Sequence, residues 1–363
     1  MQLKIGRRRF LAGGAASLAL TIGKASASNR LAALTIAARW ETGNTYLAPA
    51  TLAQGRLYFG GNRTVGVIDV AQGRELWRQT VPQPCQFRTR VGGGIVLAGG
   101  EKFFTAWQAE GGAALWQAQP ASERFGVPLI HDGRVYCGDG NRLVARDVRS
   151  GTVLWSFDAI PDTGIAYAPA AAGDTVFVGP GDGRLYALGA ADGRLRWPVN
   201  RVDEWQYLRQ MYVEGGVLVA GTYQEKLLGL STTDGRELWS VNAGNFINSQ
   251  HVTGGRAYFW SPTGWVYAVE TSTGNVLWRC RTTDYSGSPN NWATIAAELA
   301  TADKRLFVLD LSHVLHVLDI GTGEEVGRFA TPGRVQSFVV PLSGQQAVLG
   351  AASGELWLCQ LPS

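Results

Sequence analysis

The sequence predicts an all-β fold, an eight-bladed β-propeller of four-stranded antiparallel blades whose ring is closed by the N-terminal strand. A motif of Gly, three further residues and Trp follows a polar turn at six places, and successive tryptophans are 39, 39, 42, 42 and 39 residues apart. A period near 40 with short strands is typical of propeller blades. The two chain ends also look like complementary parts of one further blade. The six copies are Gly73–Trp77, Gly112–Trp116, Gly151–Trp155, Gly193–Trp197, Gly235–Trp239 and Gly274–Trp278.

The composition agrees with a repeat array. Single hydrophobic cores stop growing near roughly 250–300 residues, whereas this chain has 363. Its 47 Gly and 13 Trp with only 2 Met argue against a helical bundle. A charged fraction of 17% with 10% aromatic residues excludes a disordered chain. The mean hydropathy of −0.03 excludes a protein that spans a membrane several times.

Each repeat divides into four short strands joined by tight turns that contain glycine, because primed hairpin turns need a positive φ. In the third blade the expected strands are Phe125–His131, Arg134–Cys137, Arg142–Asp147 and Thr152–Phe157. The Trp lies on the outermost strand, where its large side chain is expected to seal the joint between neighbouring blades. A seventh copy at Gly323 is degenerate and has Gly327 in place of Trp.

The chain ends are predicted to build the eighth blade together. Ala37–Trp40 resembles an outermost strand with its Trp but has no blade before it, and the final segment has three strands and lacks the fourth. Joining them closes the ring and removes exposed sheet edges. Residues 28–363 are therefore read as a single eight-bladed domain. The three final strands are expected at Arg334–Pro341, Gln346–Leu349 and Glu355–Gln360.

Residues 1–27 read as an export signal. Arg7 and Arg8 precede an apolar stretch at 10–23 that is too short to span a bilayer, and Ala25-Ser26-Ala27 is a small-residue cleavage site. The pattern resembles a twin-arginine (Tat) signal, although Gly6 stands where Ser or Thr is usual. The alternative is a Sec signal with an Arg-rich start. Either one predicts a periplasmic or secreted protein without a transmembrane segment.

The basic charge belongs to this signal. The whole chain has a formal net charge of +4, but the signal holds five of its 33 Lys and Arg and none of its 29 Asp and Glu, which leaves the mature chain at about −1. A nucleic-acid partner is therefore not expected. No Cys follows the cleavage site, so no lipid anchor is expected either.

The eleven residues Val67–Trp77 resemble the tryptophan-docking motif of the PQQ-like (pyrroloquinoline quinone) propeller repeats, and Val144–Trp155 and Ala268–Trp278 are similar. The resemblance covers essentially the whole mature chain and implies the propeller fold. The family includes quinoprotein alcohol and sugar dehydrogenases. It also includes BamB-type outer-membrane assembly lipoproteins, which have eight such blades and no cofactor. Because one fold can carry many different functional sites, the resemblance is strong evidence for the fold and weak evidence for a function.

For the quinoprotein branch, the resemblance implies PQQ held over a Trp under a vicinal disulfide, with Glu, Asn and Asp around calcium and a further Asp as base. This chain has no adjacent cysteines and no evident Asn-Asp or Glu-Asn cluster. We therefore expect no cofactor and no metal, with PQQ plus calcium as the open alternative. Four free, mostly buried thiols are expected at Cys85, Cys137, Cys280 and Cys359.

A binding site is expected at the mouth of the central channel, where the loops from each outermost strand to the next innermost strand converge. These loops are rich in Arg, aromatic and amide side chains, which suit carboxylates, sulfates, sugar rings or planar ligands. The same residues could instead pair with Glu123, Asp203, Glu204 and Asp284 to tie loops together, or form a protein-binding rim. The candidate ligand-binding residues are Arg88, Arg90, Arg124, Tyr167, Trp205, Tyr207, Arg209, Asn248, Asn291, Trp292 and Arg334.

The leading functional hypothesis is an exported propeller that acts as a ligand-binding, protein-binding or scaffold module through this mouth. Its partner would be an anionic or planar small molecule or saccharide, or a periplasmic protein. The alternative is a periplasmic enzyme, either a quinoprotein-like oxidoreductase or a lyase or other enzyme acting on an anionic saccharide. Tyr167, Tyr207 or His251 would then supply acid–base chemistry beside an Arg-bound carboxylate. His313 and His316 are not expected to hold a metal, because their spacing on a strand points the rings to opposite faces.

Overall fold

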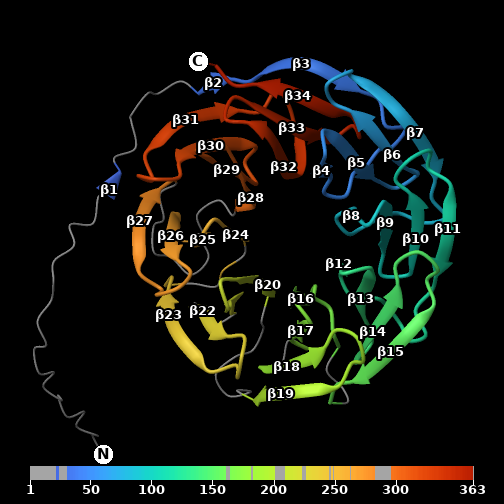
Figure 1. The fold of residues 1–363 in the computed structure, drawn as a ribbon. Helices are drawn as coiled ribbons and strands as arrows, with labels where there is room; N and C mark the ends of the chain where they lie inside the picture. Colours follow the sequence, from blue (N-terminus) through green and yellow to red (C-terminus); the bar gives the residue numbers. More distant parts are fainter. Residues whose placement is uncertain are drawn as a thin grey trace, which may run out of the picture.

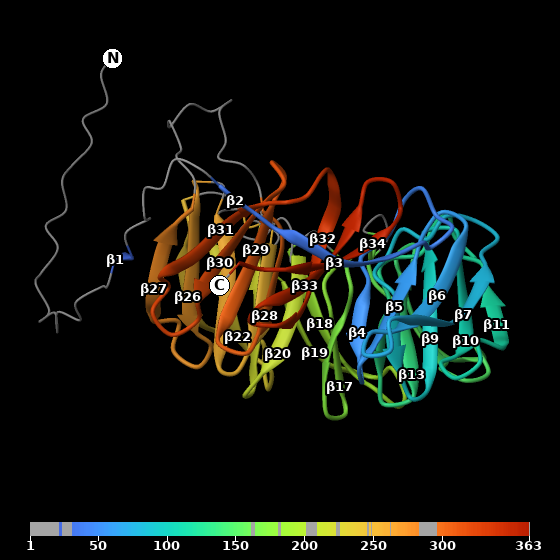
Figure 2. The same ribbon diagram turned by 90° about the horizontal axis from the view of Figure 1, so that it is seen from above.

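Eight small sheets surround a central channel, as the computed structural model shows (Figure 1). It describes residues 22–23, 31–160, 164–180, 183–200, 209–222, 226–244, 247, 249–261, 263–282 and 296–362. These residues form strands and turns, and they contain no helix that is long and apolar enough to cross a membrane. Seen from the side, the ring is a flat disc with the strands running between its two faces (Figure 2). The predicted eight-bladed propeller is confirmed.

Strand order within each blade follows the chain from the channel outward, and all four strands are antiparallel. Blade 1 holds β4 (Thr51–Ala53), β5 (Arg56–Gly60), β6 (Thr64–Asp69) and β7 (Arg74–Thr80). Blade 2 holds β8 (Arg90–Gly92), β9 (Ile95–Gly100), β10 (Phe103–Gln108) and β11 (Ala114–Ala118). Blade 3 holds β12 (Leu129–His131), β13 (Arg134–Asp139), β14 (Arg142–Asp147) and β15 (Val153–Asp158). Blade 4 holds β16 (Ala170–Ala172), β17 (Thr175–Val178), β18 (Arg184–Gly189) and β19 (Leu195–Asn200).

The second half of the ring repeats this order. Blade 5 holds β20 (Arg209–Glu214), β21 (Val217–Gly221), β22 (Lys226–Ser231) and β23 (Glu237–Asn242). Blade 6 holds β24 (Ser249–Thr253), β25 (Arg256–Ser261), β26 (Trp265–Glu270) and β27 (Val276–Arg281). Blade 7 holds β28 (Ala296–Ala302), β29 (Arg305–Asp310), β30 (Val314–Asp319) and β31 (Glu325–Ala330). Blade 8 holds β32 (Val335–Ser343), β33 (Gln346–Ala351), β34 (Leu356–Gln360) and β3 (Thr35–Trp40), and β1 (Ile22–Gly23) and β2 (Ala32–Ala33) are two short extra strands.

In blade 3 the largest difference between the predicted and the observed strands is in the innermost strand. It was expected to begin at Phe125, but it begins at Leu129. Phe125 forms an isolated antiparallel bridge with Asp139 of β13, and the segment also bonds to neighbouring loops. Phe125 N–H donates to Glu101 O at 2.8 Å, and Val127 N–H donates to Ala166 O at 3.0 Å. This segment therefore crosses the seams to blades 2 and 4 before the strand starts.

The hydrophobic core lies between blades rather than within them. One cluster, for example, joins Val67 and Trp77 of blade 1 to Val96 and Phe103 of blade 2. The Trp77 indole N–H donates to Ala109 O of blade 2 at 2.9 Å. Five further repeat tryptophans donate in the same way to the next blade, namely Trp40 to Gly73 O, Trp116 to Val148 O, Trp155 to Ala190 O, Trp239 to Thr271 O and Trp278 to Ile320 O. The expectation that these tryptophans seal the joints is confirmed.

The motif glycine is the other half of this contact. Gly112 has a φ of +69°, and a Cβ atom on it would lie 2.5 Å from the Trp77 ring. The same conflict occurs between Gly151 and Trp116 and between Gly193 and Trp155. Glycine is required there both by the backbone angle and by the indole that lies on it.

The missing Trp of blade 7 has a physical reason. Each docking glycine belongs to the turn between the third and fourth strands of the next blade, and blade 8 has no such turn because β34 and β3 come from opposite chain ends. The N-terminal segment covers the seam instead. β2 pairs in parallel with β31, Leu34 N–H donates to Ala330 O at 3.3 Å, and Leu34 is buried with Phe329. The predicted closure of blade 8 by the N-terminal strand is confirmed.

Alanine substitutions at Gly111 and Gly112 separate the two reasons for glycine in this turn. Both have a positive φ, but a Cβ on Gly111 would meet nothing within 4 Å. Gly111→Ala is expected to cost about 1 kcal/mol of unfolding free energy, and Gly112→Ala about 2–4 kcal/mol because the Trp77 indole must move. Urea denaturation measures both, and equal losses would contradict the docking account.

Candidate functional site

One face of the disc carries the loops between blades together with the turns between the second and third strands. We call it the mouth face. Its loops pack on its turns: Cys85 N–H donates to Gly61 O at 2.9 Å, and Ile165 N–H donates to Gly140 O at 2.8 Å. The opposite face carries the other two sets of turns, including those with the docking glycines.

The predicted site residues have different surroundings. Arg88 and Arg90 reach into the channel, whereas Arg124 and Arg334 are exposed on the mouth face. Tyr167 is half-buried in the loop before β16. Arg209 begins β20, and its side chain is not described. Trp205, Tyr207, Asn248, Asn291 and Trp292 lie outside the described residues, so their grouping stays a prediction.

Arg88 forms an ion pair across the channel. Its guanidinium bonds to Glu298 Oε1 of blade 7, although blades 2 and 7 are not neighbours (Figure 1). A second Arg88 nitrogen donates to Ala50 O of blade 1 at 2.5 Å. Glu298 Oε2 also accepts from Val339 N–H of blade 8 at 3.4 Å. These contacts therefore link blades 2 and 7 with blades 1 and 8, which lie between them in the ring.

Three more polar side chains complete this cross-channel cluster, which we define as Arg88, Arg90, Tyr212, His251 and Glu298. Arg90 Nε donates to Pro128 O of blade 3 at 3.0 Å. The Tyr212 hydroxyl donates to Gln250 O at 3.1 Å, and His251 Nε2 lies 3.1 Å from Thr301 Oγ1.

The electrostatics of the cluster follow from burial and from the two guanidinium groups. Burial, then the charge of Arg90, lowers the pKa of Arg88 to about 10. Burial raises the pKa of Tyr212, against the effect of both Arg side chains. Burial, then Arg88, lowers the pKa of His251, so its imidazole is neutral at pH 7. Two cations face one carboxylate, which leaves an excess positive charge in the channel.

Sequence reasoning found Arg88, Arg90 and His251 but missed Glu298 and Tyr212. The predicted residues lie in the loops between blades or directly after them, as His251 does on β24, whereas Glu298 and Tyr212 stand further along the innermost strands β28 and β20. One signal was available, because Glu298 is the single charge in the run Ala296–Ala302 on a strand that borders the channel.

Arg124 is open to a partner. Its side chain is 59% exposed, and its Nη1 lies 3.8 Å from Glu101 Oε1. An ion pair this long and exposed contributes little stability. The acid predicted beside it, Glu123, accepts a bond from Lys102 through its backbone carbonyl instead. Asp203, Glu204 and Asp284 lie outside the described residues.

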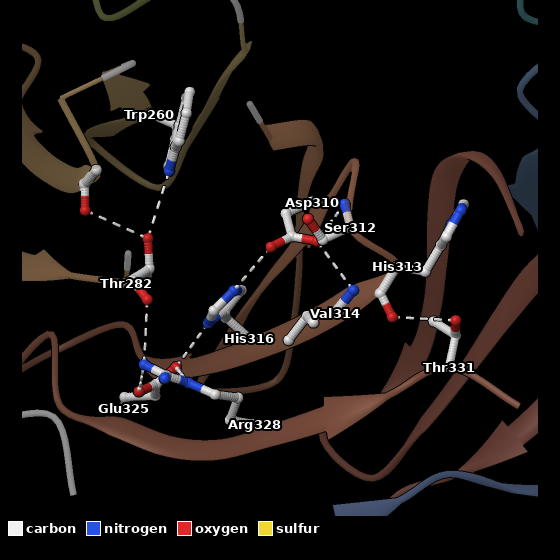
Figure 3. Close-up of polar contacts among 11 residues, drawn as sticks. Trp260, Thr282, Asp310, Ser312, His313, Val314, His316, Glu325, Arg328 and Thr331 are labelled. Atoms are coloured by element: carbon white, nitrogen blue, oxygen red, sulfur yellow. Dashed lines mark hydrogen bonds and ion pairs between the residues drawn. The ribbon is translucent and has the colours of Figure 1, made fainter. Parts of the chain in front are cut away.

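Blade 7, which lacks the docking Trp, holds a buried charged network on its side toward blade 6 (Figure 3). His316 is 3% exposed, with Nδ1 2.7 Å from Glu325 Oε1 and Nε2 3.4 Å from Asp310 Oδ2. Arg328 bonds to Glu325 at 2.7 Å and donates to Thr282 O of blade 6 at 3.1 Å. The network thus ties blade 7 to blade 6 with polar contacts.

The two histidines of the His-x-x-His motif do not converge. His313 lies in the turn before β30 with a φ of +63°, and its carbonyl accepts from Thr331 (Figure 3). Within the described residues, no group of three His, Cys, Asp or Glu side chains is placed to hold a metal ion.

The four cysteines are free and buried, as expected. Burial raises the pKa of each thiol to about 12, so they are unreactive at neutral pH. The channel carboxylate Glu298 is already bonded to Arg88. The four cysteines therefore do not form the vicinal disulfide that the quinoprotein resemblance implies.

Comparisons with known proteins agree with the fold. The family model described as outer membrane protein assembly factor BamB matches residues 61–205, 204–291 and 262–358. BamB of Pseudomonas aeruginosa is 29% identical over 199 residues, which is 48% of this chain and 48% of that protein. The serine/threonine-protein kinase AfsK of Streptomyces griseus is 28% identical over 184 residues, 48% of this chain and 18% of the kinase. The chain thus spans less than half the length of these curated relatives.

A solved structure shows the same architecture. The crystal structure of BamB from Moraxella catarrhalis superposes with a TM-score of 0.67 at 19% identity, covering 90% of this chain and all of that one. At this identity the likeness supports the propeller fold.

The buried network predicts a stability that depends on pH. Burial alone would lower the pKa of His316, but its bonds to Asp310 and Glu325 outweigh burial and raise it above 6.5. Burial alone would raise the pKa of Glu325, but His316 and Arg328 outweigh burial and lower it below 4.5. The contribution of His316 is thus complete below pH 6.5 and lost as pH rises through its folded pKa, whereas that of Glu325 is lost as pH falls below 4.5.

We expect the stability difference between the wild type and His316→Gln to be largest near pH 5.5 and smaller at pH 8.5. Urea denaturation of both proteins at the two pH values measures this. A difference that does not change with pH would show that the imidazole is not charged in the folded protein.

Proposed function

The chain belongs to the family of outer membrane protein assembly factor BamB, and on that premise we propose that it is an exported protein-binding scaffold that engages its partner through the mouth face. The observation that carries the proposal is the match of this family's model across residues 61–358. The proteins of this name among its relatives are called assembly factors, which is a role in protein association.

The charge on the mouth face supports the proposal. Arg88 and Arg90 are held inside the channel, whereas Arg124 and Arg334 stay exposed around its rim. Exposed Arg side chains are frequent anchors of protein interfaces, because they bond carboxylates through two N–H groups and pack their stems. The partner that suits this rim is a protein with an acidic surface.

Export is part of the proposal and rests on the sequence. Arg7 and Arg8 before an apolar stretch support a Tat signal, and the small-residue cleavage site at 25–27 supports a mature chain that is released into the periplasm. A periplasmic location suits relatives named as outer-membrane assembly factors.

A second candidate function, an enzyme acting on an anionic saccharide, is favoured by the cross-channel cluster. The cluster holds an excess positive charge beside His251, whose lowered pKa keeps it neutral and able to accept a proton at pH 7. An acidic sugar would bind to the guanidinium groups and lie near this imidazole.

Reversing the charge of the rim tests the scaffold function. In Arg124→Glu/Arg334→Glu we expect partner binding to fall at least about tenfold, because two attractive charges become repulsive toward an acidic surface. Partners are cross-linked to the tagged full-length protein in its own cells and quantified.

The matched control is Arg194→Glu/Arg236→Glu on the opposite face. These side chains are 88% and 70% exposed, and each pairs with an Asp two residues earlier. The control should keep binding within about twofold. Equal loss in both variants, or no loss in either, would refute the mouth-face assignment.

The second candidate is tested with an oligogalacturonate, with neutral maltotriose as the control sugar. If it is correct, the acidic probe raises the melting temperature of the wild type by about 2 °C or more at saturation. The shift disappears in Arg90→Gln, and unsaturated product accumulates only with the wild type. Absence of both the shift and the product rejects this function.

A further inference from the structure

The seam between blades 6 and 7 opens into a hollow on the face opposite the mouth face. Its volume is about 720 Å³, which is within the usual range for small-molecule sites. It lies between the turn that joins β24 to β25, the turn that joins β28 to β29 and the turn that joins β30 to β31. Its lining is polar and includes Thr253, Arg256, Tyr258, Asp303, Lys304 and Asp319.

Blade 3 accounts for the hollow, because a side chain occupies the equivalent place there. In strand register, His131 of blade 3 corresponds to Thr253 of blade 6, since each pairs with the arginine that begins the second strand of its blade. The His131 ring crosses the seam, and its Nε2 lies 2.9 Å from Gly173 O in the first turn of blade 4. A threonine side chain is too short to make this contact. The seam after blade 6 therefore stays open.

A buried tyrosine is exposed to the hollow by a second difference between the two blades. Tyr136 of blade 3 and Tyr258 of blade 6 stand at the same register position. The Tyr136 hydroxyl donates to Ala190 O of the next blade at 3.0 Å. In blade 6 the matching carbonyl, Ile320 O, accepts a bond from Arg256 instead. Tyr258 is 1% exposed and lines the hollow, so a ligand atom reaches its hydroxyl from there.

The charged side chains that line the hollow are balanced and interleaved. Two are cations and two are carboxylates. Asp303 and Lys304 are neighbours in one turn, and Asp319 directly precedes Ile320, whose carbonyl binds Arg256. Opposite charges therefore lie side by side along the walls and are not separated at two ends of the hollow.

Backbone N–H groups hold both carboxylates in place. Asp303 Oδ2 accepts from Gly344 N–H of blade 8 at 2.7 Å, and Asp319 Oδ1 accepts from Gly321 N–H at 2.8 Å. These bonds fix the carboxylates as acceptors in the walls of the hollow, beside the N–H donors of Lys304 and Arg256.

This lining suits a neutral ligand that is rich in hydroxyl groups. A hydroxyl donates one hydrogen bond and accepts two, so it can bridge a carboxylate and the cation beside it. The hydroxyls of Thr253, Thr301 and Tyr258 add further donors and acceptors. An anionic ligand would be repelled by two carboxylates, and a cationic ligand by two cations.

We propose that the hollow between blades 6 and 7 binds a neutral saccharide of one or two rings, which bonds to Arg256, Tyr258 and Lys304. The site lies on the face opposite the mouth face. It is therefore independent of the proposed scaffold function and of the cross-channel cluster.

The test is saturation-transfer NMR of the full-length protein with three neutral disaccharides, cellobiose, lactose and chitobiose. At least one of them should receive saturation from the wild type. In Thr253→His we expect its affinity to fall at least about tenfold, because the imidazole takes the place that His131 takes in blade 3 and clashes with a bound ring. Tyr258→Phe keeps the shape of the site and should weaken binding about threefold or more, because one hydroxyl is lost.

The matched control is His131→Thr, which makes the reverse change in blade 3 and should keep at least the wild-type signal. Circular dichroism melting verifies that each variant is folded. No transfer to any of the three disaccharides would overturn the proposal. Binding that is unchanged in both Thr253→His and Tyr258→Phe, or that is lost equally in His131→Thr, would also overturn it.

Discussion

A four-stranded blade has two apolar faces and cannot bury either of them alone, so the whole molecule depends on contacts between neighbouring blades. The repeated contact is an indole ring lying on a glycine of the next blade, with the indole N–H bonded to a carbonyl beside it. The period of the sequence, the positions of its glycines and the place of its core all follow from this contact. Closure of the ring by β3 and β34 then buries the last two faces.

The blade that departs from the repeat, blade 7, also has a structural explanation. Gly327 replaces the docking Trp of blade 7 because blade 8 has no turn to receive an indole, and β2 with Leu34 covers that seam. On its other side, blade 7 contacts blade 6 through the His316 network as well as through the docking Trp278.

The fold could be predicted from the sequence because the Gly-to-Trp motif is local and repeats at a constant period. The candidate site could be predicted only in part. Arg88 was found because it lies in a loop, and Arg90 because it begins β8 directly after that loop, but Glu298 is 210 residues from Arg88, and no local pattern relates the two. Nor did the sequence show that Arg88 is held inside the channel while Arg124 stays exposed, since this depends on which loop reaches a carboxylate across the ring.

The central claim is that this propeller is a protein scaffold whose partners contact the mouth face. Site-specific photo-cross-linking in the periplasm tests it most directly, with the probe placed in turn at Ser122 on the mouth face and Gly321 on the opposite face. The account predicts cross-linked partner proteins from Ser122 and none from Gly321. Partner adducts that form only from Gly321 would contradict it.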